Sequence, residues 1–438
     1  MKSMLTRTAV LTAIAVAGAG VVHASAAPSL DSLRLPKKIT AQQGHARFLA
    51  GVRLSEPAKL TVQVVRAKDS SVVQTTTDST ARPAGRAYIR VEGVDDRGYQ
   101  LAAGAYRLRI QATNNAGQTA NQLERSFRLT LSAAHGRFDA YTVPLLKSYR
   151  RQAGVAASVK GQYVAVVGPK GAVATAGLRR GDVITAIGGT SVESPGVMET
   201  ILRGLQADKP VAVSYVRRGQ AREAQVTPKP DWEPAPDYAA SLVVATRREP
   251  KSLALAAARV RQLADDNKTA QAMTLIATWP KGWSSSAVGQ QLHGDLLASQ
   301  EKWKQALGAY NRSAKKDATI AQTQLGRAIA MIEMDRAPAA VRALNLGAKL
   351  DPDDAEIAGY QAYAYLRAER SADAVTAGRR AVSLDRHYAD GYLPLGIALL
   401  DQKQRQPGVQ ALRRGLILLE DADRANRLIT TYLNPTDP

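Results

Sequence analysis

The sequence predicts three folded modules in one chain: an all-β sandwich, then an α+β domain, then an all-α array of helical repeats. Three observations support this prediction. Short alternating apolar segments fill residues 30–131, strands separated by glycine turns fill 140–230, and small residues recur every 34 positions within 251–435. At 438 residues the chain exceeds the size at which one hydrophobic core stops growing, so several domains are expected.

Residues 1–26 have the pattern of a secretory signal peptide. Lys2 and Arg7 give a positive start, an apolar run extends from Ala9 to Val22, and Ala24-Ser25-Ala26 offers small residues for cleavage. We therefore expect export to a periplasm or to the cell exterior, the alternative being an uncleaved membrane anchor. No later segment is apolar over enough residues to predict a transmembrane helix after cleavage.

Charge and cysteine content limit the possible partners. The chain has no cysteine, which excludes disulfides and cysteine metal sites. Its net charge is +21, and the excess is dispersed along the sequence. A dispersed positive surface fits adhesion to anionic cell-envelope polymers or lipid headgroups. The low aromatic content and the expected export argue against nucleic acid as a partner.

Residues 30–131 read as an immunoglobulin-like β-sandwich. The segments 58–65 and 105–112 alternate with period two, and Gly-, Asn- and Asp-rich turns separate the strands. The run from Gly93 to Tyr106 resembles the signature of Ig-like domains related to FlgD, the flagellar hook-cap protein. That resemblance implies a spacer or an interaction module, with no implication of flagellar assembly.

The run from Ala176 to Gly189 identifies the second module, at residues 140–230. Gly177 can take the left-handed conformation that caps a helix, Gly181-Asp182 makes a tight turn, and 183–187 reads as a buried strand. Ser194 is expected to cap a helix that begins at Pro195. This pattern resembles bacterial PDZ domains, the kind found in envelope proteases and secretion components.

PDZ domains bind extended peptide ends by adding a strand beside a helix. The resemblance places the carboxylate-binding loop at residues 152–155 and the pairing strand at 155–159. The helix would line the pocket for an apolar terminal side chain. The expected groove residues are Ala153, Gly154, Val155, Ala156, Ala157, Val197 and Ile201. Ala153 stands where the family usually has a bulky residue, so a structural or protein-docking role remains the alternative.

A proline-rich linker is expected over 231–250, followed by helical repeats over 251–435. Small residues recur at Gly294, Ala328, Ala362 and Gly396, and again at Ala306, Ala340, Ala374 and Gly408. This spacing resembles tetratricopeptide repeats (TPR), in which small residues let two antiparallel helices approach closely. We expect about five hairpins, four of them well matched, with 251–280 forming a degenerate first one.

Stacked repeats build a concave groove that binds peptides or partner domains. Polar positions on the first helix of each repeat are candidates to line it, the alternative being a merely solvated face. These candidates are Gln291, Asp295, Gln324, Arg327, Gln361 and Tyr365.

No residue pattern points to catalysis. The histidines lie singly, and the sequence has no metal-binding His pair, no nucleophile elbow and no phosphate loop. We therefore expect no enzyme activity, no metal and no cofactor. The leading hypothesis is an exported scaffold or adaptor for protein or peptide partners. The alternatives are a basic structural protein adhering to anionic envelope polymers, and a regulatory partner of an envelope protease.

Overall fold

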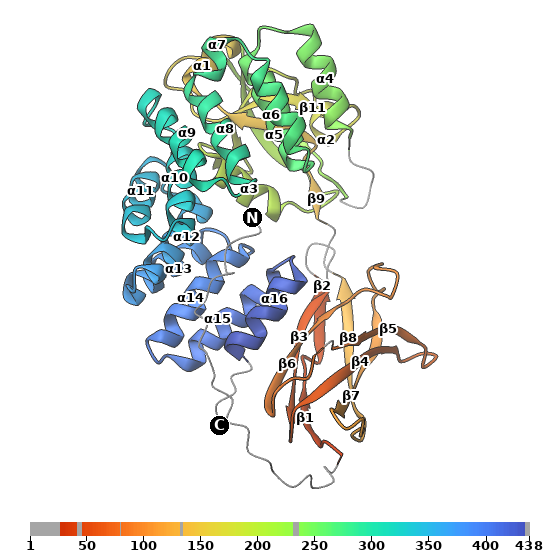
Figure 1. Cartoon of the computed structure of the whole chain (residues 1–438). Coiled ribbons are helices and arrows are strands. Elements are labelled where there is room, and N and C mark those ends of the chain that lie inside the picture. Colours follow the sequence, from red (N-terminus) through yellow and green to blue (C-terminus); the bar gives the residue numbers. More distant parts are fainter. Residues whose placement is uncertain (1–26, 42–45, 79, 132–134, 231–235, 434–438) are drawn as a thin grey trace. The chain divides into compact units, whose positions relative to one another are not determined.

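The computed structural model of the 438-residue chain describes residues 27–41, 46–78, 80–131, 135–230 and 236–433 (Figure 1). The expected signal peptide over 1–26 lies outside the described residues. The chain forms two compact units. One contains the described residues up to 130 together with 426–433, and the other contains 131–425. None of the helices formed by the described residues is both long and apolar enough to cross a bilayer.

The first unit contains a sandwich of two antiparallel sheets. One sheet has the order β1-β3-β6 and the other the order β2-β8-β7-β4-β5. The strands are β1 (Leu30–Arg34), β2 (Lys38–Ala41), β3 (Arg47–Leu54), β4 (Ala58–Arg66), β5 (Val72–Thr77), β6 (Gly85–Glu92), β7 (Gly104–Asn114) and β8 (Leu123–Leu131). The two alternating segments read from the sequence fall inside β4 and β7, which confirms them as strands.

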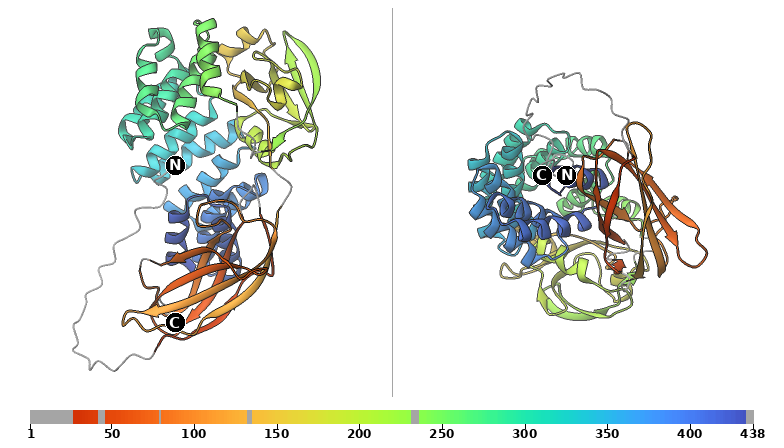
Figure 2. Two further views of the ribbon diagram at one scale, coloured as in Figure 1. Left: turned by 90° about the vertical axis from the view of Figure 1, so that its right-hand side faces the viewer. Right: turned by 90° about the horizontal axis from the view of Figure 1, so that it is seen from below.

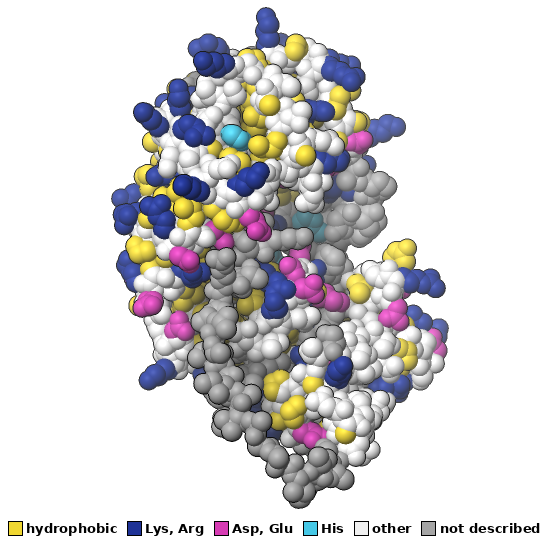
Figure 3. Space-filling model, in the orientation of Figure 1, with side chains coloured by type: hydrophobic (Ala, Val, Ile, Leu, Met, Phe, Trp, Pro, Cys, Tyr) yellow, Lys and Arg dark blue, Asp and Glu magenta, His cyan; other side chains and the backbone are white. Residues whose placement is uncertain are grey.

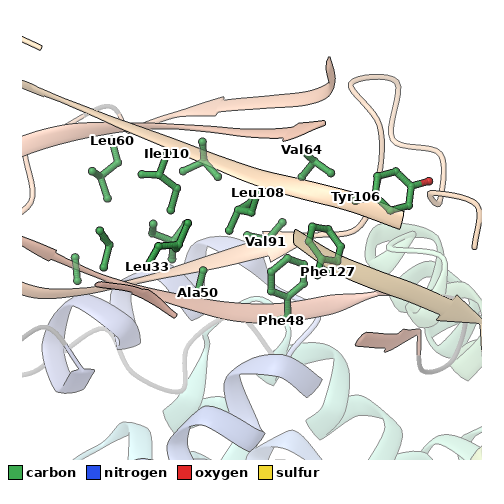
Figure 4. Packing of buried hydrophobic residues seen from close by; sticks show 14 of the residues in the cluster. Leu33, Phe48, Ala50, Leu60, Val64, Val91, Tyr106, Leu108, Ile110 and Phe127 are labelled. Atoms are coloured by element: carbon green, nitrogen blue, oxygen red, sulfur yellow. The ribbon is translucent and has the colours of Figure 1, made fainter. Parts of the chain in front are cut away.

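Side chains from both sheets meet in one apolar core (Figure 4). Leu60 on β4 and Leu108 and Ile110 on β7 are fully buried because alternate residues of a strand point to the same face. Phe48 and Phe127 pack ring against ring, with centroids 5.1 Å apart. The expected all-β sandwich is therefore confirmed.

The second unit begins with the α+β domain. Its sheet has the order β10-β11-β12-β14-β15, with β13 paired to β12, and β9 pairs separately with β16. The strands are β9 (Gly136–Arg137), β10 (Ala140–Pro144), β11 (Gln162–Val167), β12 (Val183–Ile187), β13 (Thr190–Ser191), β14 (Val211–Arg217), β15 (Gln220–Val226) and β16 (Lys229–Pro230). The helices are α1 (Lys147–Ala153), α2 (Ala172–Thr175) and α3 (Pro195–Gly204).

Local features of this domain agree with the sequence. Gly177 has φ +84° and Gly181 has φ +90°, both in the left-handed region that favours glycine. Ser194 caps α3, since its hydroxyl accepts a hydrogen bond from the amide of Val197 at 3.2 Å. Leu178, Ile184 and other apolar side chains form the core between sheet and helices.

The rest of the second unit is all-α. The helices are α4 (Tyr238–Arg248), α5 (Leu253–Asp265), α6 (Thr269–Ala277), α7 (Lys281–Ser284), α8 (Ala287–Ala298), α9 (Trp303–Lys316), α10 (Ala321–Glu333), α11 (Ala337–Leu350), α12 (Ala355–Arg367), α13 (Ser371–Leu384), α14 (Ala389–Asp401), α15 (Arg405–Leu418) and α16 (Ala422–Leu428). The residues of α16 from Asn426 onward and a π-helical turn, η1 (Ile429–Leu433), belong to the first unit. Figure 2 shows the paired helices of the array stacked in a curved row.

The 34-residue period corresponds to one helical hairpin. Ala306, Ala340 and Ala374 are fully buried on successive second helices, where larger side chains would keep the helices apart. At Gly294 an added Cβ would lie 2.6 Å from the ring of Tyr310, so only glycine fits there. Helices α5 and α6 form the degenerate hairpin expected near 251–280.

The expected linker over 231–250 is wrong for most of its length, because residues 238–248 form α4. Asp237 caps this helix by accepting a hydrogen bond from the amide of Ala240 at 2.8 Å. Leu242 on α4 is fully buried in the core of the second unit. That burial stabilises a helix at a place where the proline-rich composition predicts an extended chain.

The turns inside the hairpins share a backbone feature that sequence reasoning did not reveal. One residue in each turn has a positive φ of 57–60° although it is not glycine. These residues are Asn267, Glu301, Asp335, Glu369 and Lys403. Each of these residues is 34 positions after the preceding one. Every hairpin turn therefore contains one residue in the left-handed helical conformation at the same place.

Candidate peptide-binding groove and its junction with the array

Helix α3 carries the two pocket residues that the sequence predicts. Val197 and Ile201 are one turn apart and half-buried, whereas Met198 on the adjoining face is buried in the domain core. Ile201 packs against that core with part of its side chain. At Gly204, in the last turn of α3, a Cβ would meet no other atom within 4 Å. One face of α3 therefore remains partly open.

The strand expected at Val155–Val159 does not form, and this part of the prediction is wrong. Ala153 is the last residue of α1, Gly154 has φ +64° as the helix cap, and the following residues are turn and coil. Val155 and Val159 pack against the cluster that contains α5, while Ala156 and Ala157 are exposed. Because α1 and its cap pack toward the array, this segment offers no sheet edge.

The sheet has two terminal strands, β10 and β15, and β10 is the one whose leading segment, β9, contacts α3. Strand β11 is the only strand partner of β10 among the described residues. The other edge of β10 presents backbone N–H and C=O groups to which an extended peptide can add. Sequence reasoning missed β10, although the run from Ala140 to Val143 contains the residue types that favour strands.

The segment that leads into β10 is held at the C-terminal end of α3. The ring of His135 contacts the carbonyl oxygen of Leu202, with Nε2 and O 3.0 Å apart. An added Cβ on Gly136 would lie 2.8 Å from the backbone of Gln206, so a larger residue would push this segment away. Phe138 is buried in the domain core, the cluster against which Ile201 of α3 packs. The segment that leads into β10 is thus held against α3.

Asp139 fixes the turn into β10. It has φ +60°, and its buried carboxylate accepts a hydrogen bond from the amide of Ala172 at 3.2 Å and pairs with Arg137. Its carbonyl oxygen accepts a hydrogen bond from the amide of Gly168. Burial, and to a smaller extent Asp139, raises the pKa of Tyr238 on α4 above its ordinary value. The turn is therefore held by the domain and by the first helix of the array region.

Another face of α3 contacts the repeat array. The guanidinium of Arg203 pairs with Glu199 one turn earlier on α3 and with Asp385, whose side chain is only 2% exposed, before α14. The same group lies 6.0 Å from the ring centroid of Tyr388. At Gly196 an added Cβ would lie 2.7 Å from the carboxylate carbon of Asp354. We call this contact, made by Gly196, Glu199 and Arg203 with Asp354, Asp385 and Tyr388, the α3 junction.

Carboxyl groups on the array side of the α3 junction have unusual acidities. Burial raises the pKa of Glu356 to about 8, and Asp354, Glu199 and Asp390 add to the rise. Burial likewise raises the pKa of Asp351 to about 6, and Asp354 contributes to that shift. Near neutral pH, Glu356 is therefore largely protonated, which limits the repulsion among these acids.

A shared apolar core joins the PDZ-like domain to the array at a second place. Tyr149 on α1 and Tyr163 on β11 belong to one buried cluster with Leu242 on α4 and Leu255 on α5. At the edge of this cluster, the hydroxyl of Tyr141 donates a hydrogen bond to Asp265 at 3.3 Å. One side of β11 thus belongs to the domain core and the other to the core of the array.

The candidate groove residues of the array are mostly bonded within the protein. Gln324 is buried and accepts a hydrogen bond from Arg327 at 2.7 Å, and Arg327 also donates to Asn311 at 2.9 Å. Gln361 and Tyr365 both donate to Asn345, at 2.8 and 3.3 Å. Asn311 and Asn345 hold the same place in successive repeats. These contacts hold each first helix against the preceding second helix.

The two remaining array candidates, Asp295 and Gln291, are half-buried and buried, respectively. Tyr310 donates a hydrogen bond to Asp295 at 2.8 Å, and burial raises the pKa of Asp295 to about 6. Gln291 is buried on α8. Neither residue is the solvated side chain that the alternative interpretation expects.

No catalytic or metal-binding arrangement emerges from these contacts. Among the described residues, no group of three or more His, Asp or Glu side chains is placed to hold a metal ion. The acids whose pKa values are raised lie near the α3 junction, between repeats, or, for Asp265, against Tyr141 of β10. The arrangement as a whole can bind and position a polypeptide.

Comparison with known family models agrees with the Ig-like and PDZ modules. Residues 142–227 match the family model of PDZ domains, and residues 37–116 match that of FlgD Ig-like domains. No curated protein matches the chain. The chain therefore combines a FlgD-type Ig-like domain, a PDZ domain and a TPR array, and PDZ and TPR modules are protein-interaction modules.

Chains of low similarity among the solved structures include YrrB, MamA and PilF. YrrB, described as a TPR protein with an unusual peptide-binding site, is 13% identical, with 43% of this chain and 96% of that chain aligned and a TM-score of 0.34. MamA from Desulfovibrio magneticus RS-1 is 14% identical over 38% and 94% of the two chains, TM-score 0.34. PilF from Pseudomonas aeruginosa is 15% identical over 39% and 78%, TM-score 0.35. The TPR assignment itself rests on the 34-residue period and the paired helices of this chain.

Proposed function

We propose that this protein is an exported, non-enzymatic adaptor that binds an extended segment of a partner protein between β10 and α3. The observations that support this most directly are a terminal strand, β10, and a partly open helix face, on α3, within one domain. Among the described strands β10 pairs with β11 alone, and Val197 and Ile201 on α3 are half-buried rather than fully packed. Such an arrangement binds peptides by strand addition, with alternate side chains entering the pocket beside the helix.

The array would serve as the platform on which this groove is presented. The α3 junction and the shared apolar core attach the PDZ domain to the repeats at two places. The polar candidates between repeats are occupied by internal hydrogen bonds, so we place the primary peptide contact at β10 and α3. The signal-peptide pattern of residues 1–26 supports an envelope or extracellular location.

The test is peptide capture by the full mature chain. Immobilised random peptides with free C-termini, and the same peptides as C-terminal amides, would be incubated with wild type, Ile201→Asp and Val244→Asp. Val244 is a matched control because it is an exposed apolar residue on α4, outside the groove. We expect Ile201→Asp to lose roughly 1.5–3 kcal/mol of binding, about tenfold or more, since a charge enters an apolar pocket.

Two outcomes decide the proposal. Equal capture by wild type and Ile201→Asp would contradict a groove at α3. Preference for free C-termini over amides would show that a terminal carboxylate is recognised, whereas equal binding would indicate recognition of internal extended segments. Val244→Asp should behave as wild type in both series.

A further inference from the structure

Charge is divided between the two helices of each repeat. The second helices α9, α11, α13 and α15 together carry eleven Lys or Arg residues and one acid, Asp373. The first helices α8, α10, α12 and α14 carry five acids and two Arg residues. The positive excess of the array is therefore concentrated on its second helices.

Most of these basic residues lie on one face. Lys304, Arg312 and Lys315 are eight and three positions apart on α9, and Arg342 and Lys349 are seven apart on α11, so each set faces the same way. Lys315 and Lys349 hold equivalent places in successive repeats, as do Arg379 and Arg413. We define the basic stripe as Lys304, Arg312, Lys315, Arg342, Lys349, Arg379, Arg380, Arg413 and Arg414.

The stripe is exposed to solvent. Figure 3 shows Lys and Arg side chains along the edge where Figure 1 places α9, α11 and α13. Lys315, Arg342, Lys349 and Arg379 are all exposed, and none of the acids in the described part of the chain pairs with them. Positive charges in the last turn of a helix, such as Lys315 and Lys349, interact favourably with the helix dipole. Arg342 lies in the middle of its helix, so the dipole does not explain its charge.

We propose that the basic stripe binds a linear polyanion whose phosphate or carboxylate groups follow the row of second helices. Charge complementarity supports this occupant, because the cations recur from repeat to repeat and Asp373 is the one acid on these four helices. A bilayer surface is a poorer match, since membrane-binding helices insert large apolar side chains and only Leu346 is such an exposed residue on these helices. Single-stranded nucleic acid is also a poorer match because Trp303 and Tyr310, the aromatic residues of these helices, are half-buried and buried rather than displayed for base stacking.

This inference is independent of the peptide groove. Polyanion binding would anchor the array through its second helices while β10 and α3 bind a polypeptide. Ile201→Asp should therefore leave polyanion binding unchanged, so failure of one proposal is distinguishable from failure of the other.

The test uses the full mature chain and fluorescent inorganic polyphosphate, with affinity followed by anisotropy as sodium chloride is raised. The stripe variant carries Lys315→Gln, Arg342→Gln, Lys349→Gln and Arg379→Gln. The control variant carries Arg53→Gln, Lys59→Gln, Lys68→Gln and Arg86→Gln, four exposed basic residues of the Ig-like sandwich. Both variants lower the net charge equally.

We expect the stripe variant to bind about tenfold or more weakly, with the salt slope reduced by roughly 0.7 for each phosphate that the variant no longer neutralises. The control variant should bind as wild type does. Equal weakening in both variants would overturn the proposal, because net charge alone would then explain binding. Binding to vesicles of equal parts phosphatidylglycerol and phosphatidylcholine without binding to polyphosphate would also overturn it, in favour of a membrane surface. Unchanged circular dichroism spectra would show that both variants are folded.

Discussion

Arg203 connects the candidate groove to the repeats through one side chain. It lies on α3 two residues after Ile201, and it pairs with the buried Asp385 of the array. Val197 and Ile201 on one face of α3 are therefore positioned by Gly196, Glu199 and Arg203 on another. A buried carboxylate with a single guanidinium partner depends strongly on that partner.

Glu356 makes the α3 junction sensitive to pH. Its pKa in the folded chain is about 8, well above the ordinary value of 4.5, so the folded state holds this proton more tightly than the unfolded state. The associated stability is fully present below about pH 4.5 and is lost as pH rises toward 8. We expect Glu356→Gln to melt at higher temperature than wild type at pH 9, by roughly 2–4 °C for each kcal/mol regained, and to match wild type near pH 5.

Differential scanning calorimetry at the two pH values measures this effect. Glu301→Gln is the control, since Glu301 is an exposed acid in the turn between α8 and α9. It should show no gain at pH 9. A Glu356→Gln variant that melts with wild type at both pH values would contradict the raised pKa of Glu356.

At the scale of single elements, the hairpin turns repeat a conformation that their side chains disfavour. Glu369 has φ +59° between α12 and α13, where a residue with a Cβ costs roughly 1 kcal/mol or more. We expect Glu369→Gly to raise the free energy of unfolding by roughly 0.5–1 kcal/mol, after the entropy cost of glycine is included. Urea denaturation measures the change. Glu369→Ala keeps the strain, so an equal gain from alanine would contradict this explanation.

The elements that the sequence predicts well are those fixed by local pattern. Ser194 and Pro195 specify the start of α3, alternation specifies β4 and β7, and the 34-residue spacing specifies the repeat hairpins. These patterns involve residues close together in the sequence or at a fixed spacing, so they can be recognised without knowing the tertiary contacts.

The errors concern elements whose structure depends on distant residues. The PDZ resemblance predicts a strand from Val155 to Val159, but Tyr149 and Ala153 on α1 pack against α5, about a hundred residues later. The pairing edge that we propose is therefore β10 rather than that segment. Helix α4 was missed for the same reason, although Asp237 as a helix cap was a local signal that it begins there.

At the scale of the whole second unit, the shared apolar core predicts that the PDZ domain and the first hairpin unfold together. Leu255 on α5 is fully buried against Tyr149 and Tyr163 of the domain. We expect Leu255→Ala to cost about 2–5 kcal/mol and to reduce hydrogen-exchange protection in β11 as well as in α5. Hydrogen exchange followed by mass spectrometry resolves the two segments.

The control is Leu60→Ala, an equally buried leucine of the Ig-like sandwich. It should lower protection in β4 and β7 and leave β11 unchanged. Reduced protection confined to α5 in the Leu255→Ala variant would show that the two parts are stable separately.

The two-sided packing of β11 has a consequence for how this protein can have been assembled from older parts. A gene segment ending after β16 would carry Tyr149 and Tyr163 without the leucines that cover them, leaving an apolar surface exposed. We therefore expect domain shuffling at that boundary to be disfavoured, even though the family model ends close to it. A homologue is expected to keep or lose the PDZ domain together with at least α4, α5 and α6.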